Sequence, residues 1–281
     1  MVNSNIAILI DRKETLCRKA DLILTPSSRS DKPMIAACGL VNAGKSYLLN
    51  MLTQHIDDEF FPVADQRETA RVKMLETDNY IYVDTPGLDA SDSDTGEAMT
   101  GIDQADVVLF VHQPQGELEE NEKEFLCRLK QSFGEFAEQN IILVLSKTDK
   151  EEQEKIDEIA DKVQQQCLEF LNFSPRIFKV SGQRFKSGTQ QHKDGLIRHS
   201  HINDLASHIK IVADASVETR DIRVIQTIDA LLERMELTEA ELERYRVNVQ
   251  NKLHESFVPF NRLIDTLRST IENFENQYKN I

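Results

Sequence analysis

The residues best suited to chemistry form one short run, Gly39-Leu40-Val41-Asn42-Ala43-Gly44-Lys45-Ser46. This run fits the phosphate-binding pattern G-x-x-x-x-G-K-[ST] at every fixed position. Its glycines allow a tight turn whose N–H groups face inward, Lys45 supplies a positive charge, and the Ser46 hydroxyl can ligate Mg²⁺. The flanking sequence predicts a buried strand at 34–38 and a helix at 46–52, which is the setting that such a loop needs. The pattern therefore predicts a site for nucleotide phosphates.

A carboxylate follows the apolar run 80–83, in the sequence Asp84-Thr85-Pro86-Gly87. Ligands of open α/β sheets bind beyond the carboxyl ends of the strands. Asp84 is therefore suited to a position beside the Mg²⁺, and the Gly87 N–H can approach a γ-phosphate. A strand that ends in a plain Pro-Gly turn is the alternative interpretation.

The run Ser146-Lys147-Thr148-Asp149 follows an uninterrupted apolar strand predicted at 141–145. It resembles the guanine-reading [NT]-K-x-D motif of GTPases, with serine in the first position. A carboxylate accepts hydrogen bonds from guanine N1–H and from the 2-amino group together, and adenine offers no such donor pair. Asp149 therefore predicts selection of GTP over ATP, with the Lys147 stem against the purine ring. A turn at the strand end is the alternative.

Ser181 and Gly182 follow a further predicted strand at 177–180. They resemble the last base-contacting loop of GTPases, in which a backbone N–H meets guanine O6. A Ser-Gly turn without any ligand is the alternative.

A hydroxyl that senses the γ-phosphate is expected between the phosphate loop and Asp84. Thr69, within Arg67-Glu68-Thr69-Ala70-Arg71, lies at the expected distance and is interpreted as a switch residue that completes Mg²⁺ coordination. Residues 56–66 are interpreted as a mobile loop leading to it. The alternative is that Thr69 begins the strand predicted at 72–75.

In this order, the segments resemble the GTPase domain of the translation-factor-related class of P-loop NTPases, over about residues 34–215. The Asn-Ala-Gly-Lys-Ser run, with Leu-Leu-Asn after it, is similar to Era-type and tRNA-modification GTPases. The wider pattern resembles a bacterial dynamin-like GTPase more closely. That pattern comprises Phe61-Pro62-Val63, the segments 83–88 and 105–111, and a helical extension at both ends. The resemblance implies GTP and GDP as ligands, Mg²⁺ as cofactor, and hydrolysis of GTP to GDP and phosphate.

The sequence lacks a residue that Ras-like GTPases use for catalysis. Ras-like enzymes place a water-orienting glutamine directly after the glycine that corresponds to Gly87, and this chain has Leu88 there. Resembling families with this substitution dimerise across the nucleotide, often with a monovalent cation. Asn42 matches a potassium-binding asparagine of the tRNA-modification GTPase, so our hypothesis is that Asn42 helps to seat K⁺. Local hydrogen bonding within the loop is the alternative role for Asn42, and Arg67 and Arg71 are alternative cations.

The residues with expected roles fall into three groups. Those expected to contact the nucleotide are Gly39, Asn42, Ala43, Gly44, Lys45, Ser46, Tyr47, Ser146, Lys147, Asp149, Ser181 and Gly182. Those expected to hold Mg²⁺ are Ser46, Thr69 and Asp84. Those expected to act in catalysis are Asn42, Lys45, Thr69 and Gly87.

The composition of the chain limits the classes of partner that it is expected to bind. The net charge of −15 disfavours sequence-independent binding to DNA, RNA or anionic lipid through the bulk surface. The four cysteines are widely separated, which indicates reduced thiols rather than a metal site. No apolar run is long enough to span a bilayer, so we expect a cytoplasmic protein. The dynamin-like resemblance implies a nucleotide-dependent homodimer or a related GTPase partner, and peripheral membrane association through such a partner.

The expected fold is α/β: a P-loop GTPase domain with a mostly parallel sheet, and a helical bundle formed by the N- and C-terminal helices. The expected domains are an N-terminal helix and linker at 1–33, the GTPase domain at 34–215, and a helical region at 216–281. Within them we expect a helix at 4–24 and a loop at 182–200. After about 216, apolar residues recur at threes and fours, which predicts two long helices separated near Pro259.

Three functions remain open. The first is a dynamin-like GTPase in which dimerisation is coupled to movement of the helical bundle. The second is an Era-type regulatory switch with slow turnover, acting on a ribosome, RNA or protein partner. The third is a scaffold with a structural nucleotide, and the intact set Lys45, Ser46, Asp84 and Asp149 weighs against it.

Overall fold

The computed structural model describes residues 2–24, 31–63, 72–88, 102 and 105–279. The chain divides into two compact units. One unit comprises residues 29–224, and the other comprises residues 1–28 together with 225–281.

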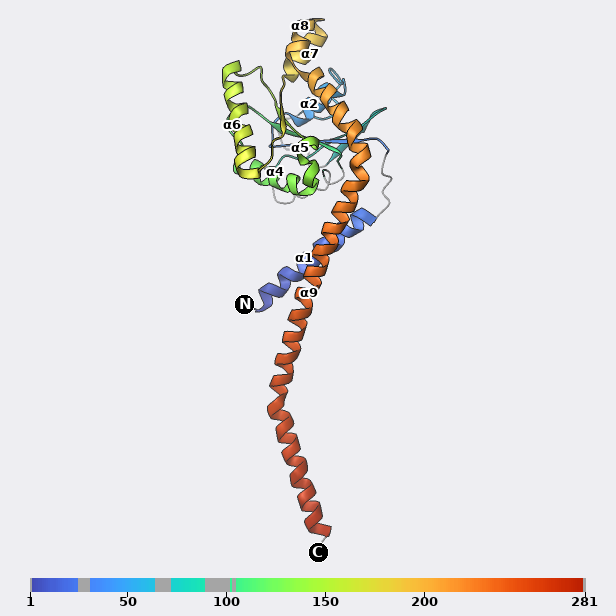
Figure 1. Cartoon of the computed structure of the whole chain (residues 1–281), viewed down its shortest axis with the longest axis vertical. Helices are drawn as coiled ribbons and strands as arrows, with labels where there is room; N and C mark the ends of the chain where they lie inside the picture. Colours follow the sequence, from blue (N-terminus) through green and yellow to red (C-terminus); the bar gives the residue numbers. More distant parts are fainter. Residues whose placement is uncertain (1, 25–30, 64–71, 89–101, 103–104, 280–281) are drawn as a thin grey trace. The chain divides into compact units, whose positions relative to one another are not determined.

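A six-stranded sheet, in the order β2-β3-β1-β4-β5-β6, forms the centre of the unit 29–224 in its described part (Figure 1). The strands are β1 (Met34–Cys38), β2 (Lys73–Glu76), β3 (Ile81–Asp84), β4 (Val107–His112), β5 (Ile141–Leu145) and β6 (Arg176–Lys179). Every neighbouring pair is parallel except β2 with β3, which confirms the mostly parallel sheet. Strands β4 and β5 are buried along their whole length, as expected for uninterrupted apolar runs covered on both faces.

Helices cover both faces of this sheet. They are α2 (Lys45–Leu52), α4 (Glu120–Phe133), the 3₁₀ turn η1 (Gly134–Phe136), α5 (Ala137–Asn140), α6 (Gln153–Leu171), α7 (Gly182–Gln190), α8 (Asp194–His199) and the first part of α9 (Ile202–Lys279). Alternate residues of each strand face opposite layers. In β5, Ile141 and Leu143 pack with α4 and α6, whereas Ile142 and Val144 pack with α2, α7 and α9.

The loop predicted at 182–200 is wrong, because the structure forms helices α7 and α8 there. The Ser181 side chain caps α7 by accepting a hydrogen bond from the Arg184 N–H at 3.0 Å. A Cβ on Gly188 would lie 2.8 Å from the Ile197 backbone nitrogen, so glycine permits the close packing of the two helices. The segment is mostly polar and buries few apolar side chains, which is why its periodicity was too weak to predict helices.

The prediction of two helices separated near Pro259 is also wrong, because α9 runs without interruption through this residue. A proline inside a helix removes one backbone hydrogen bond and costs about 3 kcal/mol. That cost is local, and the apolar repeat stays in phase across it, since Phe257 and Phe260 lie three residues apart on either side of Pro259. No glycine or asparagine that would end the helix stands immediately beside Pro259.

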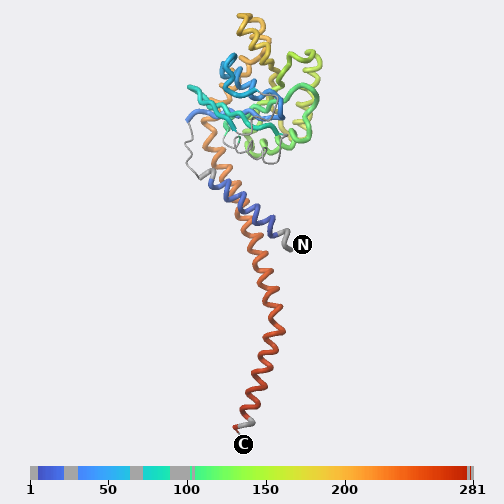
Figure 2. Tube along the Cα trace, turned by 180° about the vertical axis from the view of Figure 1, so that it is seen from behind, coloured from blue at the N-terminus to red at the C-terminus, as the bar shows by residue number. Residues whose placement is uncertain are grey.

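The second unit contains α1 (Val2–Leu24) and the part of α9 that begins at Ile225. The two helices lie against one another in both Figure 1 and Figure 2, and the Arg12 Nη1 lies 3.0 Å from the Glu241 Oε2. Leu16 is only 7% exposed. The expected association of the N- and C-terminal helices is therefore present, as a contact between two helices. None of the described helices combines the length and apolar composition that crossing a membrane requires.

A buried aspartate fixes the turns of α9 around Arg220 to the sheet within the unit 29–224. Asp106 is 3% exposed and precedes β4. Its carboxylate accepts hydrogen bonds from Arg220 Nε at 3.0 Å, from Arg220 Nη2 at 2.6 Å and from the Met34 N–H at 2.8 Å. Arg223 donates to the Ala105 carbonyl at 2.9 Å, and its guanidinium lies 4.3 Å from the centre of the Phe133 ring. One carboxylate thus joins β1, β4 and α9.

We predict that Asp106→Ala lowers the free energy of unfolding by about 3 kcal/mol, because removing one partner of a buried ion pair leaves the other partners uncompensated. Urea denaturation of the full chain measures this. Asp161→Ala, on the exposed face of α6, is the matched control and should change the free energy by less than about 0.5 kcal/mol. Equal losses in the two variants would contradict the anchoring role of Asp106.

Candidate functional site

The loop between β1 and α2 adopts the conformation that a phosphate site needs. Gly39, Asn42 and Gly44 have φ angles of 142°, 62° and 96°, so the backbone turns through conformations that most side chains disfavour. A Cβ on Gly39 would lie 2.1 Å from the Val111 carbonyl oxygen, which leaves no room for another residue. The loop then leads directly into α2, whose positive N-terminal end favours anions.

Lys45, the first residue of α2, is buried and lies against this loop. Its Nζ donates to the Gly39 carbonyl at 3.1 Å and to the Leu40 carbonyl at 2.8 Å. Lys45 is only 7% exposed, so its ammonium charge lies inside the loop and is little screened by solvent.

Ser46 and Asp84 form the second part of the site. The Ser46 Oγ donates to the Asp84 Oδ2 at 2.6 Å, and Asp84 is fully buried. The Asp84 Oδ1 has no hydrogen-bond donor among the described residues. Burial raises the pKa of Asp84, while the Ser46 hydrogen bond and the charges of Lys45 and Lys73 lower it. A buried carboxylate oxygen without a donor is costly, and oxygen ligands of this kind suit Mg²⁺.

The segment after Asp84 packs directly on the phosphate loop. The Thr85 Oγ1 donates to the Ala37 carbonyl at 2.8 Å, and a Cβ on Gly87 would lie 2.3 Å from the Val41 Cγ2. Glycine at this position therefore permits close approach of the two loops. The Leu88 side chain is 7% exposed and packs into the core beside the sheet, so it has no means of orienting a water molecule.

The predicted base-reading segment is tied to the phosphate loop by side-chain hydrogen bonds. The Ser146 Oγ donates to the Ala43 carbonyl at 2.6 Å, and its N–H donates to the His112 carbonyl at 2.8 Å. The Lys147 Nζ donates to the Asn42 carbonyl at 2.5 Å. Serine in the first motif position thus still connects the two loops, despite being shorter than asparagine.

Asp149, Ser181 and Gly182 lie together at the other end of this segment. The Ser181 Oγ donates to the Asp149 Oδ1 at 2.5 Å. A Cβ on Gly182 would lie 2.6 Å from the Tyr47 ring, so glycine permits α7 to lie against α2. Burial raises the pKa of Tyr47, and the negative charges of Asp149 and Glu59 raise it further.

The structure thus gathers the predicted residues into two connected groups beside the carboxyl ends of β1, β3, β5 and β6. The first group is centred on Lys45, Ser46 and Asp84, and the second on Asp149 and Ser181. Thr69, together with Arg67 and Arg71, lies outside the described residues. Among the described residues, no cluster of three or more histidine, cysteine, aspartate or glutamate side chains forms a separate metal site.

Asn50 is a site-supporting residue whose role was not predicted from the sequence. It is fully buried on α2, donates to the Phe61 carbonyl at 2.7 Å and accepts from the Phe61 N–H at 2.9 Å. Lys73 donates to the neighbouring Phe60 carbonyl, and its ammonium lies 4.3 Å from the centre of the Phe60 ring. Asn50 thus fixes Phe61 to the helix that begins with Lys45, and Lys73 fixes Phe60 to β2. The sequence signal for this supporting role was a polar residue, Asn50, on the buried face of α2.

His112 is a second unpredicted residue, and its backbone carbonyl holds Ser146. Its Nδ1 lies 2.8 Å from the Glu122 Oε1 and its Nε2 lies 3.0 Å from the Gly116 carbonyl oxygen. Both partners accept hydrogen bonds, which favours an imidazolium paired with a carboxylate. Burial lowers the pKa of His112, but Glu122, the Gly116 carbonyl and Glu119 together raise it above the ordinary value.

The sequence of this chain is similar to those of several known proteins. Residues 34–147 match the family described as 50S ribosome-binding GTPase. An uncharacterised protein of Acinetobacter baylyi is 29% identical over 87% of this chain and 58% of its own length. GTPase Era of Clostridium novyi is 28% identical over 54% of this chain and 51% of its own length. The chain thus spans little more than half the length of these curated relatives.

A solved structure of an oligomerised bacterial dynamin pair, described as sensing and tethering membranes, is similar in fold. It has a TM-score of 0.51 and 13% identity, and the match covers 98% of this chain and 53% of that one. Together with the sheet and the phosphate loop, the matches establish that this chain contains a P-loop GTPase domain.

We predict that His112 makes stability depend on pH. Because its folded pKa is raised above about 6.5, its stabilising contribution is complete below that pH and is lost as the pH rises through the folded pKa. The difference in free energy of unfolding between the wild type and His112→Gln should therefore shrink as the pH rises, as measured by urea denaturation across this range. His199→Gln, at an exposed histidine of α8, is the control and should show a constant difference. A constant difference for His112→Gln would contradict the charged pair.

Proposed function

We propose that this chain binds GTP with Mg²⁺ and hydrolyses it to GDP and phosphate. The observation that carries the proposal is the pair of Ser46 and Asp84, whose side chains lie 2.6 Å apart, with one buried Asp84 oxygen that has no donor among the described residues. Ser46 would ligate the metal and Asp84 would hold it from the other side. The metal, when bound, would neutralise charge that develops on the β- and γ-phosphates.

The phosphate loop would supply the remaining positive charge at this end. Its N–H groups and the N-terminus of α2 favour an anion, and Lys45 brings a buried ammonium to the same loop. The Gly87 N–H, on the loop that packs against Val41, is suited to approach the γ-phosphate. Thr69 would add a hydroxyl to the metal when the γ-phosphate is present.

Selection of guanine rests on Asp149. Its Oδ1 accepts from the Ser181 Oγ, which fixes the carboxylate, and the remaining lone pairs of Oδ1 and Oδ2 are left to accept from the two guanine donors. The Lys147 stem is held near the phosphate loop by its bond to the Asn42 carbonyl, where it can cover one face of the purine. The Gly182 backbone lies close to Tyr47 at the same end.

We further propose that catalysis depends on dimerisation across the nucleotide and on K⁺ at Asn42. Leu88 is buried in the core, so the charge stabilisation that a glutamine supplies elsewhere must have another source. Asn42 is exposed, and its side-chain amide makes no hydrogen bond with the described residues. Asn42 has a φ of 62°, a conformation that asparagine adopts more readily than most residues. Loop conformation and K⁺ binding are therefore two separate reasons for an asparagine at this position.

The cellular role that we favour is dynamin-like, with nucleotide state coupled to α9. Similarity of fold over nearly the whole chain supports this role, as does the ion pair of Arg220 with Asp106, which fixes α9 to β1 and β4. Peripheral membrane association through a partner belongs to the same proposal. An Era-type switch with slow turnover, acting on a ribosome, RNA or protein partner, is the second candidate. The matches to the ribosome-binding family and to Era favour it, and the net charge of −15 weighs against RNA.

We predict that Asp149→Asn reduces GTP affinity by at least about 100-fold and moves preference toward xanthosine triphosphate, because a site built to pair with polar groups strongly rejects an unmatched base. Isothermal titration with both nucleotides measures this. Lys45→Ala should weaken both nucleotides without lowering the unfolding temperature by more than a few degrees. An unchanged ratio of affinities in Asp149→Asn would remove the guanine assignment.

We predict that the specific activity for GTP hydrolysis rises with protein concentration and is higher in KCl than in NaCl. Asn42→Gly retains the positive φ but removes the amide, so it should abolish the difference between the two salts while still binding GTP. A rate that is slow and independent of both variables would contradict this mechanism and favour the switch. Full K⁺ stimulation in Asn42→Gly would assign Asn42 to loop conformation alone.

A further inference from the structure

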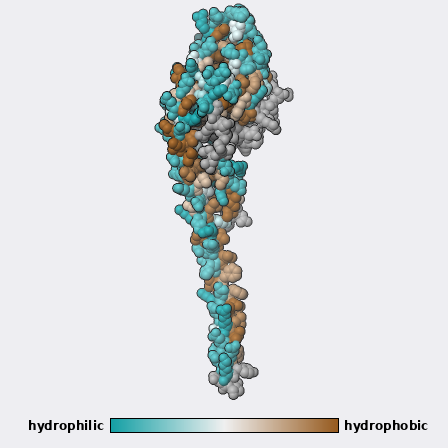
Figure 3. Space-filling view, turned by 90° about the vertical axis from the view of Figure 1, so that its right-hand side faces the viewer, coloured by the Kyte–Doolittle hydropathy of each residue, from teal (hydrophilic) through white to brown (hydrophobic). Residues whose placement is uncertain are grey.

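The last part of α9 carries an apolar seam at heptad spacing. Successive members lie alternately four and three residues apart, which is the spacing of core positions in a coiled coil. The distal seam consists of Leu253, Phe257, Phe260, Ile264, Leu267, Ile271 and Phe274. Figure 3 shows apolar residues along one edge of this part of the helix and hydrophilic residues along the other.

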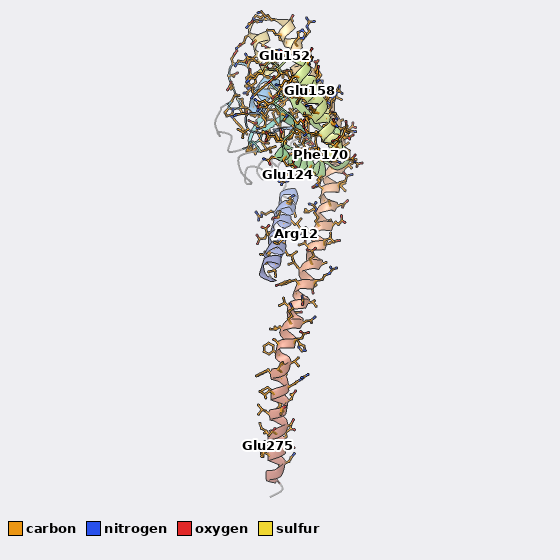
Figure 4. All side chains as sticks on the ribbon, turned by 90° about the vertical axis from the view of Figure 1, so that its left-hand side faces the viewer. Arg12, Glu124, Glu152, Glu158, Phe170 and Glu275 are labelled. Atoms are coloured by element: carbon orange, nitrogen blue, oxygen red, sulfur yellow. The ribbon has the colours of Figure 1, made fainter. Side chains whose placement is uncertain are left out.

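Six of the seven side chains of the distal seam are exposed in the described structure, and Ile264 is partly buried. Phe257 and Leu267 are each 51% exposed, and Phe274 is 62% exposed. Nearer the start of this unit, α1 covers α9, and Thr238 is only 3% exposed. Around Glu275, labelled in Figure 4, no other described segment lies beside the helix. Other apolar side chains of α9 are exposed as well, among them Ile225, Leu232 and Leu237, but the distal seam is the part in which exposed apolar residues follow heptad spacing beyond the contact with α1.

A helix of this composition requires packing. Most helical stability in proteins comes from burial of an amphipathic face rather than from intrinsic propensity. Pro259 adds a local cost within the same segment. A continuous exposed apolar stripe of this length is typical of an interaction surface.

The charges in this segment favour a second copy as the occupant. Residues 253–279 are nearly balanced, in a chain whose net charge is −15. The basic and acidic residues are Arg262, Arg268, Lys279, Glu255, Asp265, Glu272 and Glu275. The positions that flank the seam are mostly uncharged, so two identical helices would meet little repulsion. A strongly acidic or basic partner would find no complementary charge along these flanks.

The area of the seam is also sufficient for a dimer. Each half-exposed side chain of the distal seam would remove on the order of 100 Å² of surface from solvent on pairing. With six such side chains in each copy, two copies would together bury roughly 1,200 Å², which is at the lower end of the range of stable interfaces.

We propose that a second copy of this chain binds along the distal seam, forming a two-stranded coiled coil of α9 with α9. This interface is separate from the nucleotide site and does not depend on the proposed GTPase function. It holds two copies together whether or not nucleotide is present.

Sedimentation velocity of the full chain without nucleotide, over a wide range of protein concentrations, tests the proposal. The wild type should show a monomer–dimer equilibrium. Leu267→Glu should weaken dimerisation by at least about 100-fold, because each copy would bury a carboxylate in an apolar seam. Thr266→Glu introduces the same charge at the neighbouring exposed position outside the seam, and it should leave the dimer within about threefold of wild type.

The nucleotide variant separates this interface from the GTPase dimer. Lys45→Ala should dimerise as the wild type does, even though it fails to bind GTP. Circular dichroism should show that Leu267→Glu retains the helices and strands of the unit 29–224. A wild type that stays monomeric, or a dimer that persists unchanged in Leu267→Glu, would overturn the proposal. A monomer that sediments with anionic lipid vesicles through the same seam would overturn it in favour of a membrane surface.

Discussion

The hydrogen bond from Ser46 to Asp84 is the interaction on which the site depends. It requires a fully buried carboxylate to lie at the first turn of α2, where Lys45 and the helix N-terminus supply positive charge. Parallel pairing of β1 with β3 makes this possible, because the register sets Ala37 opposite Asp84. The sheet order therefore determines which two loops meet. Burial raises the pKa of Asp84, and the Ser46 hydroxyl and the two nearby lysines oppose that rise, so each group depends on the others.

The guanine-reading half is held to the phosphate half by a small number of polar contacts. Ser146 connects the Ala43 carbonyl with His112, and Lys147 reaches the Asn42 carbonyl. His112 is in turn held by Glu122 from α4. A change of charge at this buried pair can therefore reach the loop that would read the base, although neither residue lies in a recognised motif. The shorter serine suffices because the Ala43 carbonyl lies 2.6 Å away.

The sequence was sufficient to predict the parts of the fold that have strong local signals. Strands β1 and β5 begin and end where their apolar runs do, and the phosphate loop was evident from residue types alone. Contacts between distant residues were not predictable. Asp106 pairs with Arg220, and Asn50 with the backbone of Phe61, only after the chain has folded. The sequence predicted a break in α9 at Pro259 because a proline disfavours a helix locally. The apolar repeat that continues on both sides of Pro259 indicates one helix instead.

The two ends of α9 are supported by different contacts. In the unit 29–224, Leu205 and Ile209 are buried in the core and Arg220 pairs with a buried carboxylate, so the domain itself determines this part of the helix. The distal seam has no such support among the described residues, and a solitary helix with an exposed apolar stripe is marginal in water. The proposed second copy would supply the missing burial along this stripe. Helix α9 thus takes its order from the domain core in residues 202–224 and, under the proposed pairing, from a second copy along the distal seam.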